Sequence, residues 1–352
     1  MTHADAVRIV ICEDSPTYAR ALRVFLEVDD GFDVVEICPS AEQLLIRLPD
    51  LRPDLVTMDL ELPGLDGVAA IQQIMTTDPR RIVVVSAHTE RGSERAAAAL
   101  TAGALEAIHK RDLRLDTARS SAATDLRQRI KHLAATRVRR VPPVATADRL
   151  RGPSRAPGRL RGRSTAVVAI GSSTGGPAAL AELLAKLPAD YEIPILVAQH
   201  ISPGFTPGLA RWLDHVVAVP VGVASHRQPA GPGVWFAPSE SHLELSRDMT
   251  MSLSTRAAGS HRPSVNALLT SVAGRAGPAA VAVVLTGMGS DGADGVAAIR
   301  TAGGVAIAQD EATSVVNGMP AAAIRRGAEL VMAPAQIGAA LVTLAPARRA
   351  AS

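Results

Sequence analysis

The sequence predicts two α/β domains joined by a linker, and three observations lead to this prediction. With 352 residues, the chain is long for a single hydrophobic core. In both halves, short β-branched runs alternate with helix-like stretches, which is typical of parallel sheets covered by helices. Between the halves, residues 136–163 combine nine arginines, four prolines and three glycines with a single acid, Asp148. Such a composition favours a flexible tether, so we expect domains over 1–135 and 164–348.

The composition also limits the cellular compartment and the binding partners that can be expected. No apolar run approaches the roughly 20 residues that span a bilayer, and the N-terminus lacks the layout of a secretory signal. Cys12 and Cys38 lie in strand-like runs without metal-ligand spacing, so we expect a reducing, cytoplasmic compartment. The arginines of residues 136–163 could contact nucleic acid or acidic lipid. Because no aromatic residues are interleaved with them, a solvated tether is favoured and no nucleic-acid partner is expected.

The first half predicts a (βα)5 domain with a parallel sheet. Five short runs are expected as strands, namely VRIVIC (7–12), FDVVEI (32–37), DLVTMD (54–59), RIVVVS (81–86) and LEAIH (105–109). Helix-like stretches lie between them over 17–28, 41–48, 66–76 and 91–102. Sheets of this kind bind ligands beyond the carboxyl ends of their strands.

Polar residues stand at those carboxyl ends. Glu13 and Asp14 follow the first strand, and Asp59 ends the third. Three carboxylates at one edge repel one another unless a hard cation joins them, and Mg²⁺ fits because it takes few carboxylates and keeps waters for an incoming phosphate. Ser86 ends the fourth strand and Lys110 follows the fifth, where both would meet phosphate oxygens. Only three of the 37 basic residues are lysines, so a lysine here indicates a need for a compact ammonium.

The second half opens with a glycine-rich stretch, IGSSTGGPAAL (170–180), directly after an apolar run. A P-loop is excluded because no lysine follows the glycines, and the dinucleotide-binding fingerprint fails on spacing. The pattern Gly-x-Ser-x-Gly fits Gly171, Ser173 and Gly175, and at a strand-to-helix turn it leaves the serine exposed for nucleophilic attack. A glycine-rich turn with incidental serines is the alternative.

A nucleophilic serine needs a base, and the base needs an orienting group. The strand PILVAQH (194–200) ends in His200, and the later strand AAVAVV (279–284) leads into a glycine-rich turn that carries Asp291. All three side chains would lie at one edge of a doubly wound, mostly parallel sheet, in a domain that we expect to contain a β-hairpin as well. Ser173, His200 and Asp291 are therefore the predicted catalytic residues. Their chain order differs from that of the common α/β-hydrolases.

Other residues compete for two of these roles. His261 precedes a helix in the stretch HRPSVN and could act as the base or bind substrate, and His242 also lies in this half. Asp294 could replace Asp291, although Asp291 is nearer the strand end.

The oxyanion of a tetrahedral intermediate needs hydrogen-bond donors. Glycines flank Met288 in TGMGSDG and free its backbone N–H to point inward. The helix N-terminus after Ser173, beginning at Thr174, is expected to help.

Residues 7–133 resemble the receiver domain of two-component response regulators through the stretches ICEDSP, MDLELPGLDG, VSAH and HK. The resemblance implies that a histidine kinase phosphorylates Asp59 and that the three carboxylates hold Mg²⁺. Two positions depart from the usual pattern. Arg111 stands where receivers usually have proline, and Ala107 where an aromatic switch residue often sits. These departures argue against the usual coupling between Ser86 and an aromatic residue, but not against phosphorylation.

Residues 166–345 look like the catalytic domain of the chemotaxis-type protein-glutamate methylesterases. The stretches GSSTGGP, QHISPGFTPGLA, APSESHLEL, HRPSVN, LTGMGSDGADG and NGMP carry the resemblance. It implies that Ser173 attacks glutamate methyl esters on methyl-accepting chemoreceptors, that His200 takes the serine proton, and that Asp291 holds the histidine tautomer. It also implies deamidation of certain receptor glutamines and no cofactor for the hydrolytic step.

Together the two resemblances imply a phosphorylation-activated hydrolase of chemotaxis adaptation whose unphosphorylated receiver covers the active site. Contact with the membrane would come only through the receptors, and a monomer is expected. The alternative is a phosphorylation-controlled binding module whose second domain is catalytically idle. The intact set of Ser173, His200 and Asp291 argues against idleness.

Overall fold

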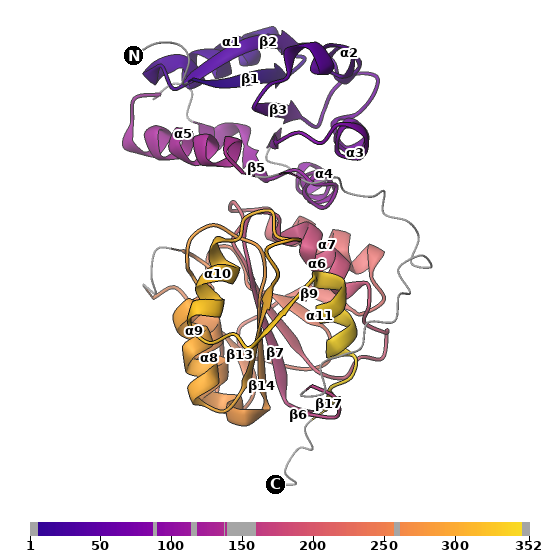
Figure 1. Cartoon of the computed structure of the whole chain (residues 1–352), viewed down its shortest axis with the longest axis vertical. Helices are drawn as coiled ribbons and strands as arrows, with labels where there is room; N and C mark the ends of the chain where they lie inside the picture. Colours follow the sequence, from indigo (N-terminus) through magenta and orange to yellow (C-terminus); the bar gives the residue numbers. More distant parts are fainter. Residues whose placement is uncertain are drawn as a thin grey trace. The chain divides into compact units, whose positions relative to one another are not determined.

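The chain forms two compact units, residues 1–145 and 146–352 (Figure 1). The computed structural model describes residues 6–86, 90–113, 118–136, 138, 160–256 and 261–346. Most of the predicted linker, 136–163, lies outside these described residues. Within the described part of the chain, no helix is both long enough and apolar enough to cross a membrane.

The first unit is a five-stranded parallel sheet with its helices, as predicted. The strand order is β2-β1-β3-β4-β5, and every pairing is parallel. The strands are β1 (Val7–Cys12), β2 (Phe32–Cys38), β3 (Leu55–Asp59), β4 (Ile82–Ser86) and β5 (Glu106–His109). The helices are α1 (Pro16–Leu26), α2 (Ala41–Leu51), α3 (Gly67–Thr77), α4 (Glu90–Thr101) and α5 (Ser121–Ala134), with short 3₁₀ turns η2 (Glu27–Asp29) and η3 (Lys110–Leu113).

Local sequence explains these elements. Every residue of β3 and β4 is buried, as expected for central parallel strands with apolar, β-branched sequences. The helices begin at polar caps, because Ser15 accepts a hydrogen bond from Tyr18 N and Ser40 accepts one from Gln43 N. Helix α3 begins in the same way at Asp66.

The second unit contains a seven-stranded sheet of order β16-β15-β14-β7-β8-β11-β9, in which every pairing is parallel. Its strands are β7 (Val167–Ser172), β8 (Ile195–Gln199), β9 (Val221–Val223), β11 (Val234–Phe236), β14 (Ala280–Val284), β15 (Val305–Gln309) and β16 (Leu330–Met332). A small antiparallel sheet supplies the predicted hairpin, with β10 (Gln228–Pro229), β13 (Thr250–Ser254) and β12 (His242–Leu245). Two further strands, β6 (Ser164–Thr165) and β17 (Ala345–Pro346), pair with each other.

Helices cover both faces of the seven-stranded sheet, which makes the unit doubly wound. Figure 1 shows α8, α9 and α10 on one side of the strands and α6, α7 and α11 on the other. Their bounds are α6 (Gly176–Leu184), α7 (Thr206–Val216), α8 (Val265–Ala276), α9 (Ala293–Thr301), α10 (Gly318–Arg325) and α11 (Pro334–Leu341), with the 3₁₀ turn η5 at Gly277–Ala279.

The strand order of this sheet reverses at β7. The chain starts the sheet with β7, adds β8 on one side, and later adds β14 on the other. In open α/β sheets, the crevice at such a switch point, beyond the carboxyl ends of the strands, is where ligands bind. The loops after β7, β8 and β14 are those that carry Ser173, His200 and Asp291.

The second unit begins earlier than the sequence analysis places it. Leu160, assigned there to the linker, is fully buried. Gly162 N donates a hydrogen bond to Thr343 O, and Arg163 N donates one to Leu160 O. We therefore propose that this unit includes Leu160 and does not begin at Ser164.

Candidate active site

The turn after β7 presents Ser173 at the carboxyl edge of the sheet. Ser173 N donates to Thr286 O (3.0 Å), and Gly176 N donates to Ser173 O (2.8 Å), so the turn is held on both sides. Ser173 is half-buried, whereas Ser172 is fully buried. The Ser172 hydroxyl donates to Gln199 Oε1 at 2.6 Å. Of the two hydroxyls, Ser173 is therefore the one that a substrate can reach.

The glycines of this turn answer two different needs. Gly175, the N-cap of α6, has a φ of 77°, which lies in the left-handed region that favours glycine. Gly171 and Gly176 provide space instead. A Cβ on Gly171 would lie 2.1 Å from Val265 Cγ1, and one on Gly176 would lie 2.2 Å from Gln199 Oε1. The close approach of α8 and of Gln199 thus explains why so few side chains are present here.

His200 and Asp291 meet across this edge, with 2.9 Å between Nε2 and Oδ2. Their side chains are only 10% and 8% exposed. Asp294, the competing acid, is exposed and forms an ion pair with Arg326. The structure therefore brings Asp291, and not Asp294, to His200.

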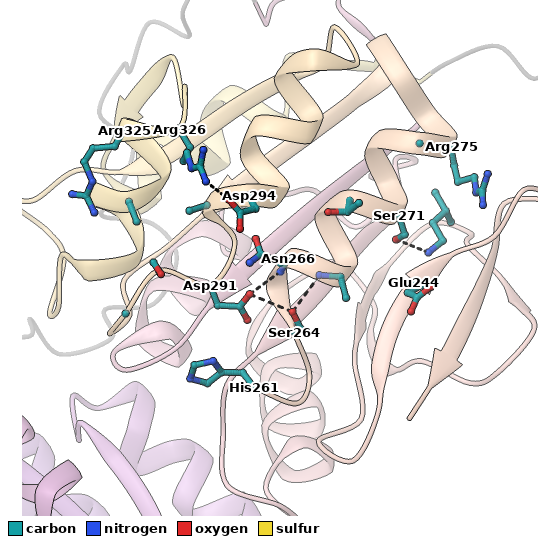
Figure 2. Close-up of a pocket in the computed structure, with 18 residues that line it drawn as sticks. Glu244, His261, Ser264, Asn266, Ser271, Arg275, Asp291, Asp294, Arg325 and Arg326 are labelled. Carbon is teal, nitrogen blue, oxygen red and sulfur yellow. Dashed lines mark hydrogen bonds and ion pairs between the residues drawn. The ribbon is translucent and has the colours of Figure 1, made fainter. Parts of the chain in front are cut away.

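The Asp291 carboxylate also rests on the N-terminus of α8. It accepts hydrogen bonds from Val265 N (2.8 Å), Asn266 N (2.9 Å) and Ser264 Oγ (3.3 Å), and Figure 2 shows those to Ser264 and Asn266. Burial alone would raise the pKa of Asp291, but the hydrogen bonds from His200 and from the two amides hold that pKa below its usual range. Asp291 is therefore a fixed, charged partner for His200.

The other two histidines occupy distinct places. His261 stacks on His200, with ring centroids 4.3 Å apart and an interplanar angle of 6°. His242 is buried, and its Nδ1 accepts a hydrogen bond from Ser264 N (3.0 Å). His261 is thus a neighbour of the predicted base, while His242 supports the residue that caps α8.

Ser173 and His200 follow the neighbouring strands β7 and β8, but their side chains are not hydrogen-bonded to each other. Among the contacts of the described residues, none joins Ser173 Oγ to His200. Because Nε2 of His200 faces Asp291, Nδ1 is the ring nitrogen left for the serine proton. Catalytic hydrogen bonds often tighten only when substrate binds.

The predicted oxyanion donors, Thr174 and Met288, lie on the loops after β7 and β14. Hydrogen bonds of the Thr286 side chain link the Thr174 loop to Val316. Thr286 Oγ1 donates to Thr174 O (3.0 Å) and accepts from Val316 N (2.9 Å). Thr174 and Met288 are half-buried, and no acceptor for either backbone amide is present within the described ranges. Their assignment as oxyanion donors stays a prediction, and both amides are free to serve.

A second cluster lies at the carboxyl edge of the sheet in the first unit. Glu13, Asp14 and Asp59 each offer an oxygen within 4.8 Å of the others. Glu13 and Asp59 are buried, and Asp14 is exposed. Three carboxylates with one open side fit Mg²⁺, a hard cation that prefers oxygen ligands and retains water.

Lys110 completes this cluster. Its Nζ donates to Asp59 Oδ2 (2.8 Å) and to Glu13 Oε1 (2.9 Å). Burial raises the pKa of Glu13, although the hydrogen bond from Lys110 opposes that rise. Burial alone would lower the pKa of Lys110, but the bonds to Asp59 and Glu13 raise it. Lys110 therefore stays an ammonium between two carboxylates.

An aromatic residue that the sequence analysis does not single out contacts Lys110. The ring centroid of Tyr18, on α1, lies 4.5 Å from Lys110 Nζ, and the Tyr18 hydroxyl donates to Lys110 O (3.3 Å). Ala107 is buried in β5, Ser86 is buried at the end of β4, and Arg111 is exposed in η3. Tyr18 of α1 therefore supplies an aromatic contact to Lys110, while position 107 in β5 supplies no ring.

Two known families match different parts of the chain. Residues 168–341 match CheB methylesterase, and residues 9–117 match the response regulator receiver domain. The chain is 41% identical to protein-glutamate methylesterase/protein-glutamine glutaminase 3 of Myxococcus xanthus (strain DK1622), over 90% of this chain and 88% of that protein. The chain belongs to the CheB-type protein-glutamate methylesterase/protein-glutamine glutaminase family. The resemblance drawn from the sequence is confirmed.

A second relative of this CheB-type chain agrees with the assignment. It is 40% identical to protein-glutamate methylesterase/protein-glutamine glutaminase 4 of the same Myxococcus strain, over 90% of each chain. A crystal structure of the Thermotoga maritima CheB methylesterase catalytic domain is 37% identical and covers 51% of this chain and 98% of its own, with a TM-score of 0.49.

The sequence analysis of this CheB-type chain misses the residues that support the catalytic candidates. Gln199 Nε2 donates to Ser173 O (2.9 Å) and to His200 O (2.7 Å). Asn266 Oδ1 accepts from Gly292 N (3.0 Å), beside Asp291. A polar residue at the end of an otherwise apolar strand is the signal that could have found Gln199.

Proposed function

We propose that the chain is a phosphorylation-activated hydrolase that removes methyl groups from glutamate methyl esters of chemoreceptors, and deamidates specific receptor glutamines, in chemotaxis adaptation. The observation that carries the proposal is the 2.9 Å contact between His200 and Asp291 at the sheet edge that also presents Ser173. Family membership supports the reaction class, and these three residues supply its chemistry.

Acylation begins at the half-buried serine. Ser173 Oγ attacks the ester carbonyl carbon while His200 Nδ1 takes the hydroxyl proton. The Asp291 carboxylate balances the charge of the imidazolium and keeps its Nε2–H directed toward itself. The backbone amides of Thr174 and Met288 donate to the oxyanion that forms on the former carbonyl oxygen.

Collapse of the tetrahedral intermediate completes acylation, and hydrolysis of the acyl-enzyme follows. His200 returns the proton to the leaving methoxide oxygen, and methanol departs from an acyl-enzyme on Ser173. A water then loses a proton to His200 and attacks the acyl carbon. His200 passes that proton to Ser173 Oγ as the bond between this oxygen and the acyl carbon breaks, which releases glutamate and restores the serine hydroxyl. A glutamine side chain follows the same steps, with ammonia leaving in place of methanol.

The receiver supplies the regulation. A histidine kinase would phosphorylate Asp59, with Ser86 and Lys110 meeting the phosphoryl oxygens. Glu13, Asp14 and Asp59 would hold Mg²⁺, which neutralises phosphoryl charge when bound. Phosphorylation would relieve an inhibition that the unphosphorylated receiver exerts on the hydrolytic domain.

Methanol release from methylated chemoreceptor membranes, with a small-molecule phosphodonor, tests the proposal. Ser173→Ala should reduce the rate by about 10⁴-fold or more, as loss of a triad member does. Ser172→Ala is the matched control and should remain active, because that hydroxyl is buried and bonded to Gln199. A Ser173→Ala variant with a near-normal rate would overturn the assignment.

A further inference from the structure

A groove of about 1180 Å³ extends from the candidate active site along α8 (Figure 2). His261, Ser264 and Asp291 line one end, and Arg275 and Glu244 line the other. With a helical rise of about 1.5 Å per residue, Asn266 and Arg275 are roughly 14 Å apart along α8. The groove is therefore long as well as large, and it exceeds the roughly 300–1,000 Å³ of a typical small-molecule site.

The floor of this groove is a partly exposed face of α8 with small side chains. Ala267, Thr270, Ser271 and Gly274 line it at helical spacing, and none of them is charged. Exposed helix faces ordinarily carry long charged residues. A Cβ added to Gly274 would meet no atom within 4 Å, so the space above it is open. The floor is thus smooth over two helical turns.

The rim of the groove carries two arginines that form no ion pair within the described ranges. The groove is lined by three arginines, Arg275, Arg325 and Arg326, and by three acids, Glu244, Asp291 and Asp294. Asp291 is already held by His200 and by the N-terminus of α8. Arg326 is neutralised by its ion pair with Asp294. Arg275 and Arg325 are exposed, and no ion pair involves either within the described ranges. They are available to an acidic partner.

We propose that this groove binds the acidic helical segment of the substrate polypeptide that carries the ester. The inference rests on the proposed function and adds the surface that selects the polypeptide. Small floor residues let the backbone of an incoming helix approach closely, and the free arginines pair with its carboxylates. The groove ends at His261 and Asp291, which both contact His200, so a segment lying in it would end beside the proposed base. Binding energy from residues one or two turns away would then position the reacting carbonyl.

A steric test uses two substrates of different size on the full chain. One is methylated chemoreceptor membrane, assayed by methanol release, and the other is 4-nitrophenyl acetate, which is too short to reach Gly274 from the active site. For Gly274→Trp, the ratio of kcat/KM on receptor to kcat/KM on the small ester should fall at least about tenfold, mainly through the KM for receptor. Arg247→Trp, which adds the same ring at an exposed residue outside the groove, is the matched control and should leave the ratio within about twofold.

A charge test is independent of the steric one. Arg325→Glu and Arg275→Glu should each lower the same ratio about fivefold and weaken its dependence on salt concentration. Arg247→Glu, at an exposed arginine outside the groove, is the control and should change neither. Arg325 is exposed, so Arg325→Glu should fold normally. It therefore still tests the inference if Gly274→Trp does not fold.

The outcomes separate the inference from the proposed function. An unchanged ratio in Gly274→Trp and in both charge variants would overturn the groove assignment. So would an equal loss on both substrates, because the variants would then act on the catalytic residues themselves. If the wild-type chain hydrolyses 4-nitrophenyl acetate but no receptor ester, the proposed function is refuted, and this inference is refuted with it.

Discussion

The Ser172 hydroxyl donates a 2.6 Å hydrogen bond to Gln199 Oε1 where the neighbouring strands β7 and β8 end. The same carboxamide donates from Nε2 to the carbonyl oxygens of Ser173 and His200. One buried side chain thus spaces the two strand ends that carry the proposed nucleophile and base. Gln199 is therefore a positioning residue for the reaction.

Gln199→Leu should damage both stability and rate. It leaves the Ser172 hydroxyl and two carbonyl groups without their buried partner, which should lower the free energy of unfolding by about 1–3 kcal/mol. Misplacement of Ser173 relative to His200 should lower kcat for methanol release by roughly 10–100-fold. Urea denaturation and receptor hydrolysis measure the two effects. Ser172→Ala removes one hydrogen bond and keeps the two carbonyl contacts, so an equal kcat loss there would contradict the positioning role.

Substitution of the two stacked histidines should give different results. His200→Gln removes the proposed base and should be inactive in methanol release, with a loss of about 10⁴-fold or more. His261→Gln removes a ring that stacks on the proposed base but leaves His200 and its bond to Asp291 in place, so it should retain most of the activity. Steady-state kinetics on methylated receptors decide between them. A reversed ranking would move the base to His261.

The low pKa of Asp291 predicts a pH-dependent contribution to stability. A carboxyl whose pKa is depressed in the folded state stabilises that state above its unfolded pKa, and the contribution is lost as pH falls through the folded pKa. The difference in free energy of unfolding between wild type and Asp291→Asn should therefore be largest near neutral pH and should shrink below about pH 4. Urea titrations of both proteins at several pH values measure it. A difference that grows on acidification would contradict the assigned direction.

The sequence predicts the sheets and the strand-end residues, because those follow from local pattern. β-branched runs identify the strands, and parallel topology brings the loops after β8 and β14 to the same edge, on either side of the loop after β7. The contact between His200 and Asp291 could be anticipated on this basis. The same reasoning predicts that Glu13, Asp14 and Asp59 lie together at the carboxyl edge of the receiver sheet.

What the sequence does not predict depends on loop conformation and side-chain rotamers. Gln199 reaches two carbonyls only because Gly176 leaves room for its carboxamide. The stacking of His261 on His200 depends on a loop that returns from the small antiparallel sheet. Leu160 is buried although its neighbours in sequence read as a tether, since composition reports an average over the segment and not one side chain.

Asp59→Asn should abolish activation by a phosphodonor. The amide cannot form an acyl phosphate, and it is a poorer Mg²⁺ ligand than the carboxylate. Methanol release is compared with and without the phosphodonor and Mg²⁺, for wild type and variant. Glu61→Gln, two residues beyond Asp59 and outside the carboxylate cluster, is a matched control that should still respond. Undiminished activation in Asp59→Asn would refute the assignment of the phosphorylated residue.

The hydrolytic unit should fold and act without the receiver. The two units have separate sheets, and the segment between them is rich in arginine and proline. Because Leu160 is buried and Gly162 bonds to Thr343, a fragment should begin near residue 155. A fragment that begins at Ser164 is the matched control. It lacks Leu160 and should unfold at a lower urea concentration.

The longer fragment should hydrolyse receptor esters faster than the unphosphorylated full chain, because truncation removes the inhibiting receiver. We also expect truncation to activate more than a phosphodonor does. Ala107 supplies no aromatic ring in β5 to couple phosphorylation to release, so phosphorylated chains should remain partly inhibited. Methanol release from one receptor preparation compares the three states. A stable fragment that is slower than the unphosphorylated full chain would show that the receiver helps to build the active site. That result would refute inhibition by the receiver while leaving the assignment of Ser173, His200 and Asp291 intact.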